Sequence, residues 1–181
     1  MRFARCLLLV CCLGATASLR ASDAASFEAG GFGFAVPAAW RSIPPASPMR
    51  KAELLVPGPD GTGDKGAATV TVFHFGPGEG GGVQQNVDRW FGQFGGDRDK
   101  IGAATAKETI GNVPVTFVRA RGTFQSGMPG GPTTPLENQA LLGAILESPG
   151  GDVYVKMTGP LPTVEKAESA FVQMIRSACE K

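Results

Sequence analysis

The sequence predicts an α+β protein in which an antiparallel sheet of about six to seven strands is covered by two main helices. Three observations predict it. Short apolar runs with alternating side chains recur along the chain, two segments change to a helical period, and 26 glycines and 14 prolines gather mostly between the runs. Strands that follow one another across short turns pair antiparallel, and helices with one apolar face can cover such a sheet.

The strand pattern begins soon after the N-terminal segment. Phe32, Phe34 and Val36 alternate with small residues, and Pro37 ends the run. The same reasoning predicts later strands at 51–56, 68–75, 105–110, 113–125, 139–147 and 153–158. Gly111-Asn112 is a turn signal that joins two of these strands as a hairpin.

Two segments have the period of an amphipathic helix. Residues 83–94 and 163–178 place apolar side chains three and four positions apart, so each presents one apolar face. Trp90 lies on the first of these faces, where we expect it to anchor the core. The glycine-rich segment 76–82 and the Gly/Pro segment 126–135 are expected to be loops.

The N-terminal residues have the order of a secretory signal peptide. Arg2 and Arg5 precede a short apolar run, and small residues follow it, with Ala17 or Ala21 as the expected last residue of the leader. The run is too short to span a bilayer, which needs about 20 apolar residues. The expected organisation is a signal peptide over 1–21, a flexible lead-in over 22–29 and a single α+β domain over 30–181.

Cysteine usage agrees with an exported protein. Cys6, Cys11 and Cys12 lie in the leader, and Cys179 alone remains in the expected mature chain, which therefore has no internal disulfide. Val10 precedes Cys11, whereas a lipidation signal requires a small residue there. We expect a periplasmic or secreted protein rather than a lipid-anchored one.

The charge balance argues against several classes of partner. Without Arg2, Arg5 and Arg20 of the leader, 14 basic residues remain against 16 acidic residues, a net charge of −2. A domain that neutralises many phosphates should be basic, so we expect no nucleic-acid partner. The sequence also contains no polybasic membrane segment and no metal-binding motif, and we expect no cofactor.

The glycine loop at 76–82 formally matches the G-x-G-x-x-G pattern of dinucleotide sites. Pro77 removes a backbone donor that a phosphate would use, and Glu79 places a negative charge in the loop. The strands that follow form hairpins rather than βαβ units, which is the stronger argument against that function. A β–α connection, or a helix N-terminus that holds some anion, remains as the alternative.

The overall layout resembles the PsbP-like fold, in which an antiparallel sheet lies between helices. The resemblance rests on Phe34-Ala35-Val36-Pro37 leading to Trp40, on the hairpins from 105 to 158 and on the closing helix 163–178. Members of this superfamily include photosystem II extrinsic subunits, a Ran-binding nuclear protein and bacterial envelope proteins. The residues Phe75-Gly76, the following glycine run and Asn86, Arg89-Trp90 and Gln93-Phe94 are also similar to exported bacterial proteins without an assigned activity.

The first helix has the most informative polar pattern. Asn86, Arg89 and Gln93 are spaced i, i+3, i+7 and fall together on one flank of its apolar stripe. Aligned in this way beside Trp90, they could hydrogen-bond a polar ligand or a partner carboxylate. The alternative is that they tie the helix to neighbouring loops.

Two further residues are candidates for a binding surface. His74 is the sole histidine and shares a strand face with Val70 and Val72, a pattern that is more typical of a structural histidine than of a base or ligand. Arg50 follows a Pro/Ser turn and is a candidate surface contact. His74 has no second histidine and no nearby nucleophile in the sequence, and we expect no catalytic residues.

These features predict an exported, non-enzymatic binding or accessory module of the cell envelope. We expect its partner to be another envelope protein or a small polar ligand. Two alternatives remain open: a small exported enzyme that uses His74 and the 76–82 loop, and a purely structural envelope protein.

Overall fold

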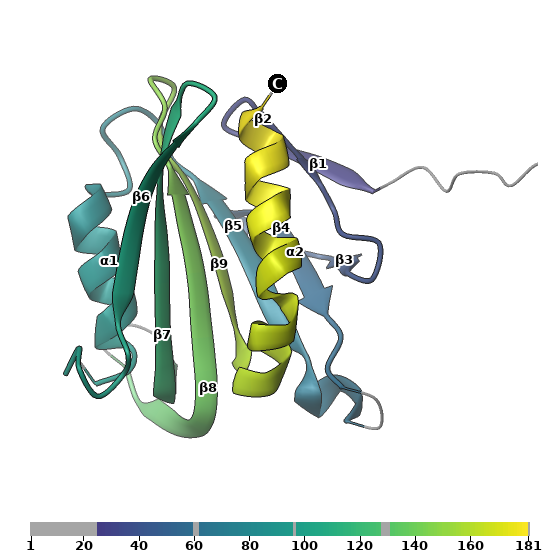
Figure 1. Ribbon diagram of the computed structural model, residues 1–181, viewed down its shortest axis with the longest axis vertical. Helices are drawn as coiled ribbons and strands as arrows, with labels where there is room; N and C mark the ends of the chain where they lie inside the picture. The colour runs from purple at the N-terminus through teal and green to yellow at the C-terminus, as the bar shows by residue number, and fades with distance from the viewer. Residues whose placement is uncertain (1–24, 60–61, 96, 128–130, 181) are drawn as a thin grey trace, which may run out of the picture.

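The computed structural model, which describes residues 25–59, 62–95, 97–127 and 131–180, is built on a seven-stranded sheet (Figure 1). The strand order is β3-β4-β5-β9-β8-β7-β6, and every neighbouring pair is antiparallel. The strands are β3 (Arg41–Ile43), β4 (Arg50–Val56), β5 (Ala68–His74), β6 (Ala104–Ile110), β7 (Val113–Gly127), β8 (Thr133–Leu146) and β9 (Val153–Pro160). The predicted α+β class and antiparallel sheet are confirmed.

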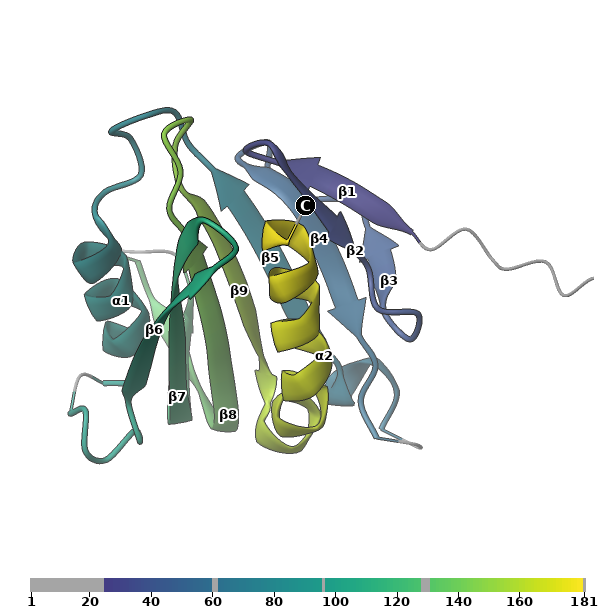
Figure 2. The ribbon, with the colours of Figure 1, turned by 45° about the horizontal axis from the view of Figure 1, so that its top comes forward.

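Two helices, α1 (Val83–Gly92) and α2 (Leu161–Cys179), cover opposite faces of this sheet (Figure 2). Alternation along β8 separates the two layers. Leu141 and Ile145 pack in the cluster that contains α1, whereas Leu142 and Leu146 pack in the cluster that contains α2. Successive side chains of a strand point to opposite faces, so one strand supplies both cores. Within the described residues, neither helix is long and apolar enough to cross a membrane.

The segment before the first expected strand contains a strand of its own. A small second sheet pairs β1 (Ser26–Ala29) with β2 (Phe32–Ala35), and the rings of Phe27 and Phe34 stack with centroids 4.8 Å apart. The last four residues of the expected flexible lead-in over 22–29 therefore form a strand. The stacking of Phe27 on the buried ring of Phe34 outweighs the small, polar character of the segment. Residues 1–24, including the predicted signal peptide, lie outside the described residues.

The long hairpin β7–β8 extends into the segment expected to be a loop. Ser126 pairs with Thr134, and Gly127 pairs with Thr133, so strand pairing covers much of 126–135. Ladder hydrogen bonds join backbone groups, which every residue other than proline has in full. A Gly/Pro-rich composition therefore weakens a strand without forbidding it.

The helix boundaries differ from the expected ones by a few residues. Helix α1 ends at Gly92 and leaves Gln93 as its C-cap, and α2 starts at Leu161 rather than at Thr163. Thr163 does not cap α2: its buried hydroxyl donates to the carbonyl of Gly66 at 2.6 Å. Thr163 thus ties α2 to the segment that precedes β5.

Candidate functional site

Helix α1 lies close to the sheet because β8 has a glycine beneath it. A Cβ at Gly143 would collide with the ring of Trp90, which is 6% exposed. Just beyond Trp90, at the C-terminal end of α1, the backbone N–H of Gln125 on β7 donates to the carbonyl of Gln93 at 2.7 Å. These contacts fix the position of α1, and with it the polar flank that the sequence identified.

A cleft of about 490 Å³ lies beside this flank. Strands β5 and β9 contribute Phe73, Tyr154 and Lys156, α1 forms one wall, and Met49 and the ends of β7 and β8 complete the lining. The volume is within the range of small-molecule sites. The lining residues are Met49, Phe73, Phe75, Asn86, Arg89, Trp90, Gly92, Gln93, Gln125, Gly127, Thr133, Tyr154 and Lys156. They include two cations and no carboxylate.

Lys156 is a lining residue that sequence reasoning missed. It lies half-buried on β9, and its ammonium donates to the Oε1 atom of Gln93 at 3.2 Å. Burial, and then the positive charges of Arg50 and Arg89, lower the pKa of Lys156 from 10.5 to about 8. Among the described residues it has no ion-pair partner. The structure thus keeps a cation where its charged form is disfavoured.

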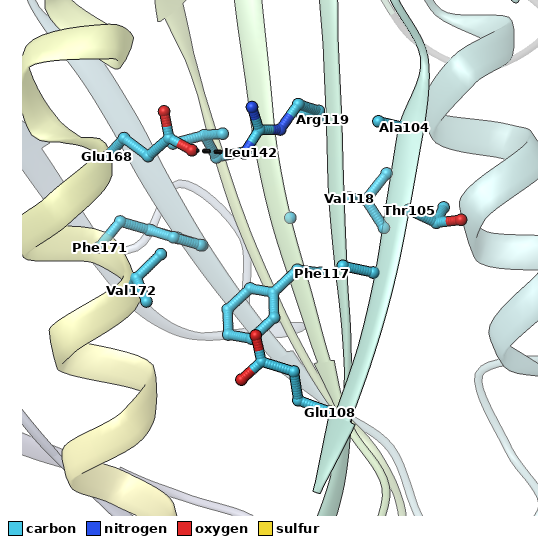
Figure 3. Close-up of a pocket in the computed structure, with 12 residues that line it drawn as sticks. Ala104, Thr105, Glu108, Phe117, Val118, Arg119, Leu142, Glu168, Phe171 and Val172 are labelled. Carbon is cyan, nitrogen blue, oxygen red and sulfur yellow. Dashed lines mark hydrogen bonds and ion pairs between the residues drawn. The ribbon is translucent and has the colours of Figure 1, made fainter. Parts of the chain in front are cut away.

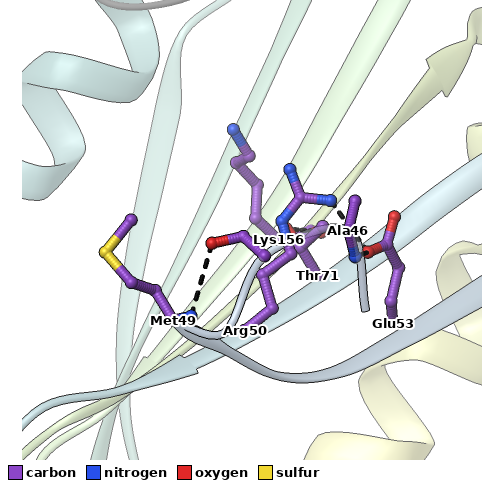
Figure 4. Close-up of polar contacts among 7 residues, drawn as sticks. Ala46, Met49, Arg50, Glu53, Thr71 and Lys156 are labelled. Carbon is purple, nitrogen blue, oxygen red and sulfur yellow. Dashed lines mark hydrogen bonds and ion pairs between the residues drawn. The ribbon is translucent and has the colours of Figure 1, made fainter. Parts of the chain in front are cut away.

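Arg50 is close to this lysine but its charge is balanced. Its Nη1 atom lies 2.8 Å from Oε2 of Glu53, and the same carboxylate oxygen accepts from the backbone N–H of Ala46 at 2.9 Å. Figure 4 shows the guanidinium of Arg50 beside Lys156, with the carboxylate of Glu53 on its other side. Glu53 is 7% exposed. Arg50, predicted as a surface contact, therefore holds the loop before β4 in place.

The three polar residues of α1 divide into different roles. Asn86 is 2% exposed, and its amide donates to the carbonyls of Gly80 and Gly82, each at 3.0 Å. Arg89 is exposed at the cleft and donates to the side-chain oxygen of Asn86. Asn86 therefore ties the helix to the neighbouring loop, as the alternative interpretation of these three residues predicts. Arg89 instead presents its remaining N–H groups to the cleft.

The glycine loop is fastened to the sheet as well as to α1. The hydroxyl of Tyr154 donates to the carbonyl of Gly81 at 2.8 Å. Burial, and then the negative charge of Asp152, raise the pKa of Tyr154, so its hydroxyl stays protonated and available as a donor. The loop carbonyls thus accept hydrogen bonds from within the chain, which gives the loop a structural role.

His74 lies on the other face of the sheet. It follows Val70 and Val72, which pack in the cluster with α2, and its Nε2 atom lies 3.2 Å from the carbonyl oxygen of Gly150. The structure therefore brings Arg89, Gln93 and the braced Asn86 together at one cleft but does not bring His74 to it. Within the described residues, no group of three or more His, Cys, Asp or Glu side chains is arranged to hold a metal ion.

A second groove lies on the opposite face, between α2 and strands β6 and β7 (Figure 3). It has a volume of about 270 Å³ and an apolar floor that includes Phe117 and Phe171. Arg119 reaches across it to Glu168, with Nη2 and Oε1 2.7 Å apart. Because the groove's arginine is already paired with a carboxylate, this groove is less suited than the α1 cleft to attract a charged ligand.

Comparison with known proteins identifies the fold. The solution structure of cyanobacterial PsbP (CyanoP) from Synechocystis sp. PCC 6803 superposes with a TM-score of 0.52 over 91% of this chain and 96% of that chain, at 13% identity. The chain has a PsbP-like fold. At such low identity the similarity shows the architecture alone.

Weaker similarities accompany the PsbP-like match. PA94 from Pseudomonas aeruginosa, described as a putative regulator, has a TM-score of 0.40 at 12% identity over 84% of this chain and 94% of that chain. LpqN of Mycobacterium tuberculosis, described as involved in cell envelope biogenesis, has the same score and identity over 82% and 79%. No protein-family model and no curated protein matches the sequence.

Proposed function

We propose that the chain is an exported, non-enzymatic binding module of the cell envelope and that it binds through the cleft beside α1. The observation that carries this proposal is the composition of the cleft. Exposed Arg89 and half-buried Lys156 line the cleft together with aromatic side chains. Among the described residues, no carboxylate lines it. A concave, largely apolar site with a few convergent polar groups is the usual form of a ligand site.

One feature of the sequence and one of the structure support the exported, non-enzymatic part of the proposal. The order of Arg2, Arg5, the apolar run and the small residues is that of a signal peptide. His74 is directed to a backbone carbonyl on the face opposite the cleft, where it has no part in cleft chemistry. Export predicts a secreted or periplasmic product whose mass corresponds to an N-terminus between Ser18 and Asp23. A full-length cytosolic product would contradict it.

The binding part is tested by Arg89→Ala, with Arg41→Ala as the matched control. Arg41 is an exposed arginine on β3, and it does not line the cleft. Because Arg89 is exposed, we expect its truncation to change the stability by less than about 0.5 kcal/mol. It should weaken capture of molecules that co-purify with the mature domain from the envelope fraction, since an arginine fork is hard to replace.

The two measurements separate binding from bracing. Loss of stability with retained capture would reject the cleft as the binding surface and leave Arg89 as a support for Asn86. Unchanged stability with lost capture, together with normal capture by Arg41→Ala, supports the proposal. If Arg89→Ala changes both, Gln93→Ala is the milder variant with which to repeat the comparison.

A further inference from the structure

The two cations of the α1 cleft lack the carboxylate partner that five other cations of the described residues have. The arginines at 50, 98, 119 and 176 and Lys100 each lie within ion-pair distance of a carboxylate. Lys156 and Arg89, the two cations of the cleft, have no such partner among the described residues. Lys156 makes one hydrogen bond, to a neutral amide, and Arg89 likewise donates to a neutral amide oxygen.

The geometry leaves donors unused at both cations. An ammonium has three N–H groups and a guanidinium has five, so each side chain retains donors after its contact inside the protein. Both side chains line the same cleft, and the positive charge of Arg89, after burial and Arg50, contributes to the lowered pKa of Lys156. An anion placed between them would relieve this repulsion and accept charge-assisted hydrogen bonds from both.

Four aromatic side chains line the cleft beside the two cations. Phe73 and Phe75 lie nearly parallel, with ring centroids 6.3 Å apart, and Tyr154 lies 6.1 Å from Phe75. Trp90 lines the cleft beside them, and Met49, at 61% exposed, is the most exposed large apolar side chain of the described residues. Such a surface attracts an apolar body rather than a second charge.

We infer that this cleft takes a small amphipathic anion, with an acidic group bound between Lys156 and Arg89 and an apolar body lying against Phe73, Phe75 and Trp90. The inference rests on the proposed binding function and adds the chemistry of the ligand. The volume of about 490 Å³ fits one small organic molecule. Gln93, which also lines the cleft, accepts a hydrogen bond from the ammonium of Lys156.

Two fluorescent probes with the same aromatic skeleton test the inference. The probe 8-anilinonaphthalene-1-sulfonate is an amphipathic anion, and N-phenyl-1-naphthylamine lacks only its sulfonate. We expect the mature protein to bind the sulfonate probe at least about tenfold more tightly than the neutral probe, because a charge-assisted hydrogen bond contributes about 1.5–3 kcal/mol. Lys156→Met and Arg89→Met should each remove about tenfold of the sulfonate affinity and leave the neutral probe unaffected.

Three controls show where the probes bind and whether each variant is folded. Lys107→Met changes an exposed lysine of β6, outside the cleft, and should bind both probes as the wild type does. In an NMR titration, the indole N–H resonance of Trp90 should shift while that of Trp40, in the cluster on the other face, should not. Thermal denaturation of each variant shows that it is folded when probed.

The outcomes separate this inference from the proposed function. If both probes bind equally and the charge substitutions change neither affinity, the ligand is not an anion, although the cleft remains a binding surface. A shift of Trp40 in place of Trp90, or no binding of the sulfonate probe, would likewise overturn the inference. The binding part of the proposed function is tested separately, by the capture experiment with Arg89→Ala.

Discussion

Lys156→Met should make the protein more stable, although it removes a hydrogen bond. Methionine retains most of the aliphatic stem of lysine and is tolerated in irregular apolar surroundings. The substitution deletes a half-buried ammonium that has no ion-pair partner among the described residues and that Arg50 and Arg89 repel. A stability gain on removing a polar residue is the signature of a residue kept for function rather than for folding.

The magnitude follows from the pKa of Lys156, which is about 8 in the folded protein against an ordinary value of 10.5. At 1.36 kcal/mol for each pKa unit, the charged form is disfavoured by at most about 3 kcal/mol below pH 8. Solvent screening at a half-buried site and loss of the contact with Gln93 reduce the expected gain to about 1–2 kcal/mol. Between pH 8 and 10.5 the unfolded chain binds a proton that the folded protein has lost, so wild-type stability rises with pH through this window.

Urea denaturation at pH 7 and at pH 10.5 measures this difference. We expect Lys156→Met to be more stable than the wild type at pH 7, with most of the advantage gone at pH 10.5. Both proteins contain Tyr154 and Cys179, so their titration cancels from the comparison. Lys107→Met, which removes an exposed charge, should change stability little at either pH. If Lys156→Met were less stable by the same amount at both pH values, the reasoning from desolvation would be refuted.

Three further predictions test packing, two of them around the cleft and one on the opposite face. Gly143→Ala should destabilise the protein by about 1–3 kcal/mol, since the new methyl group collides with Trp90. Gly92→Ala is the control, because a methyl group there meets open space and should be tolerated. Equal denaturation midpoints for the two variants would contradict this reasoning. Asn86→Ala should cost about 1–3 kcal/mol in thermal or urea unfolding, because two hydrogen bonds to glycine-loop carbonyls are lost. Cys179 is buried and its pKa is raised, first by burial and then by Glu180, so a thiol reagent should label it slowly in the native state and rapidly in urea.

Periodicity in the sequence determined most of the architecture. Alternating apolar residues located the main strands, and the helical period located both covering helices, because burial of one face imposes a period of 2 or 3.6 on any element that covers a core. Strand β3 was not predicted, since its three residues are too few to show a period. Strand β1 was missed because its burial depends on stacking between Phe27 and Phe34, a contact that becomes visible only once the two strands are paired.

Some residues of the candidate site could likewise be predicted from the sequence, and others only from the tertiary structure. Helical spacing alone aligned Asn86, Arg89 and Gln93, because residues three, four and seven apart share a helix face. Only the tertiary structure added Lys156, which lies 63 residues beyond Gln93 along the chain yet donates to its side chain. Its strand appears in the sequence as an ordinary apolar run with one lysine. That lysine comes to lie in the cleft only when antiparallel pairing places β9 in the sheet next to α1. The two arginines that help to lower its pKa, Arg50 and Arg89, belong to β4 and α1, which are distant from β9 along the chain.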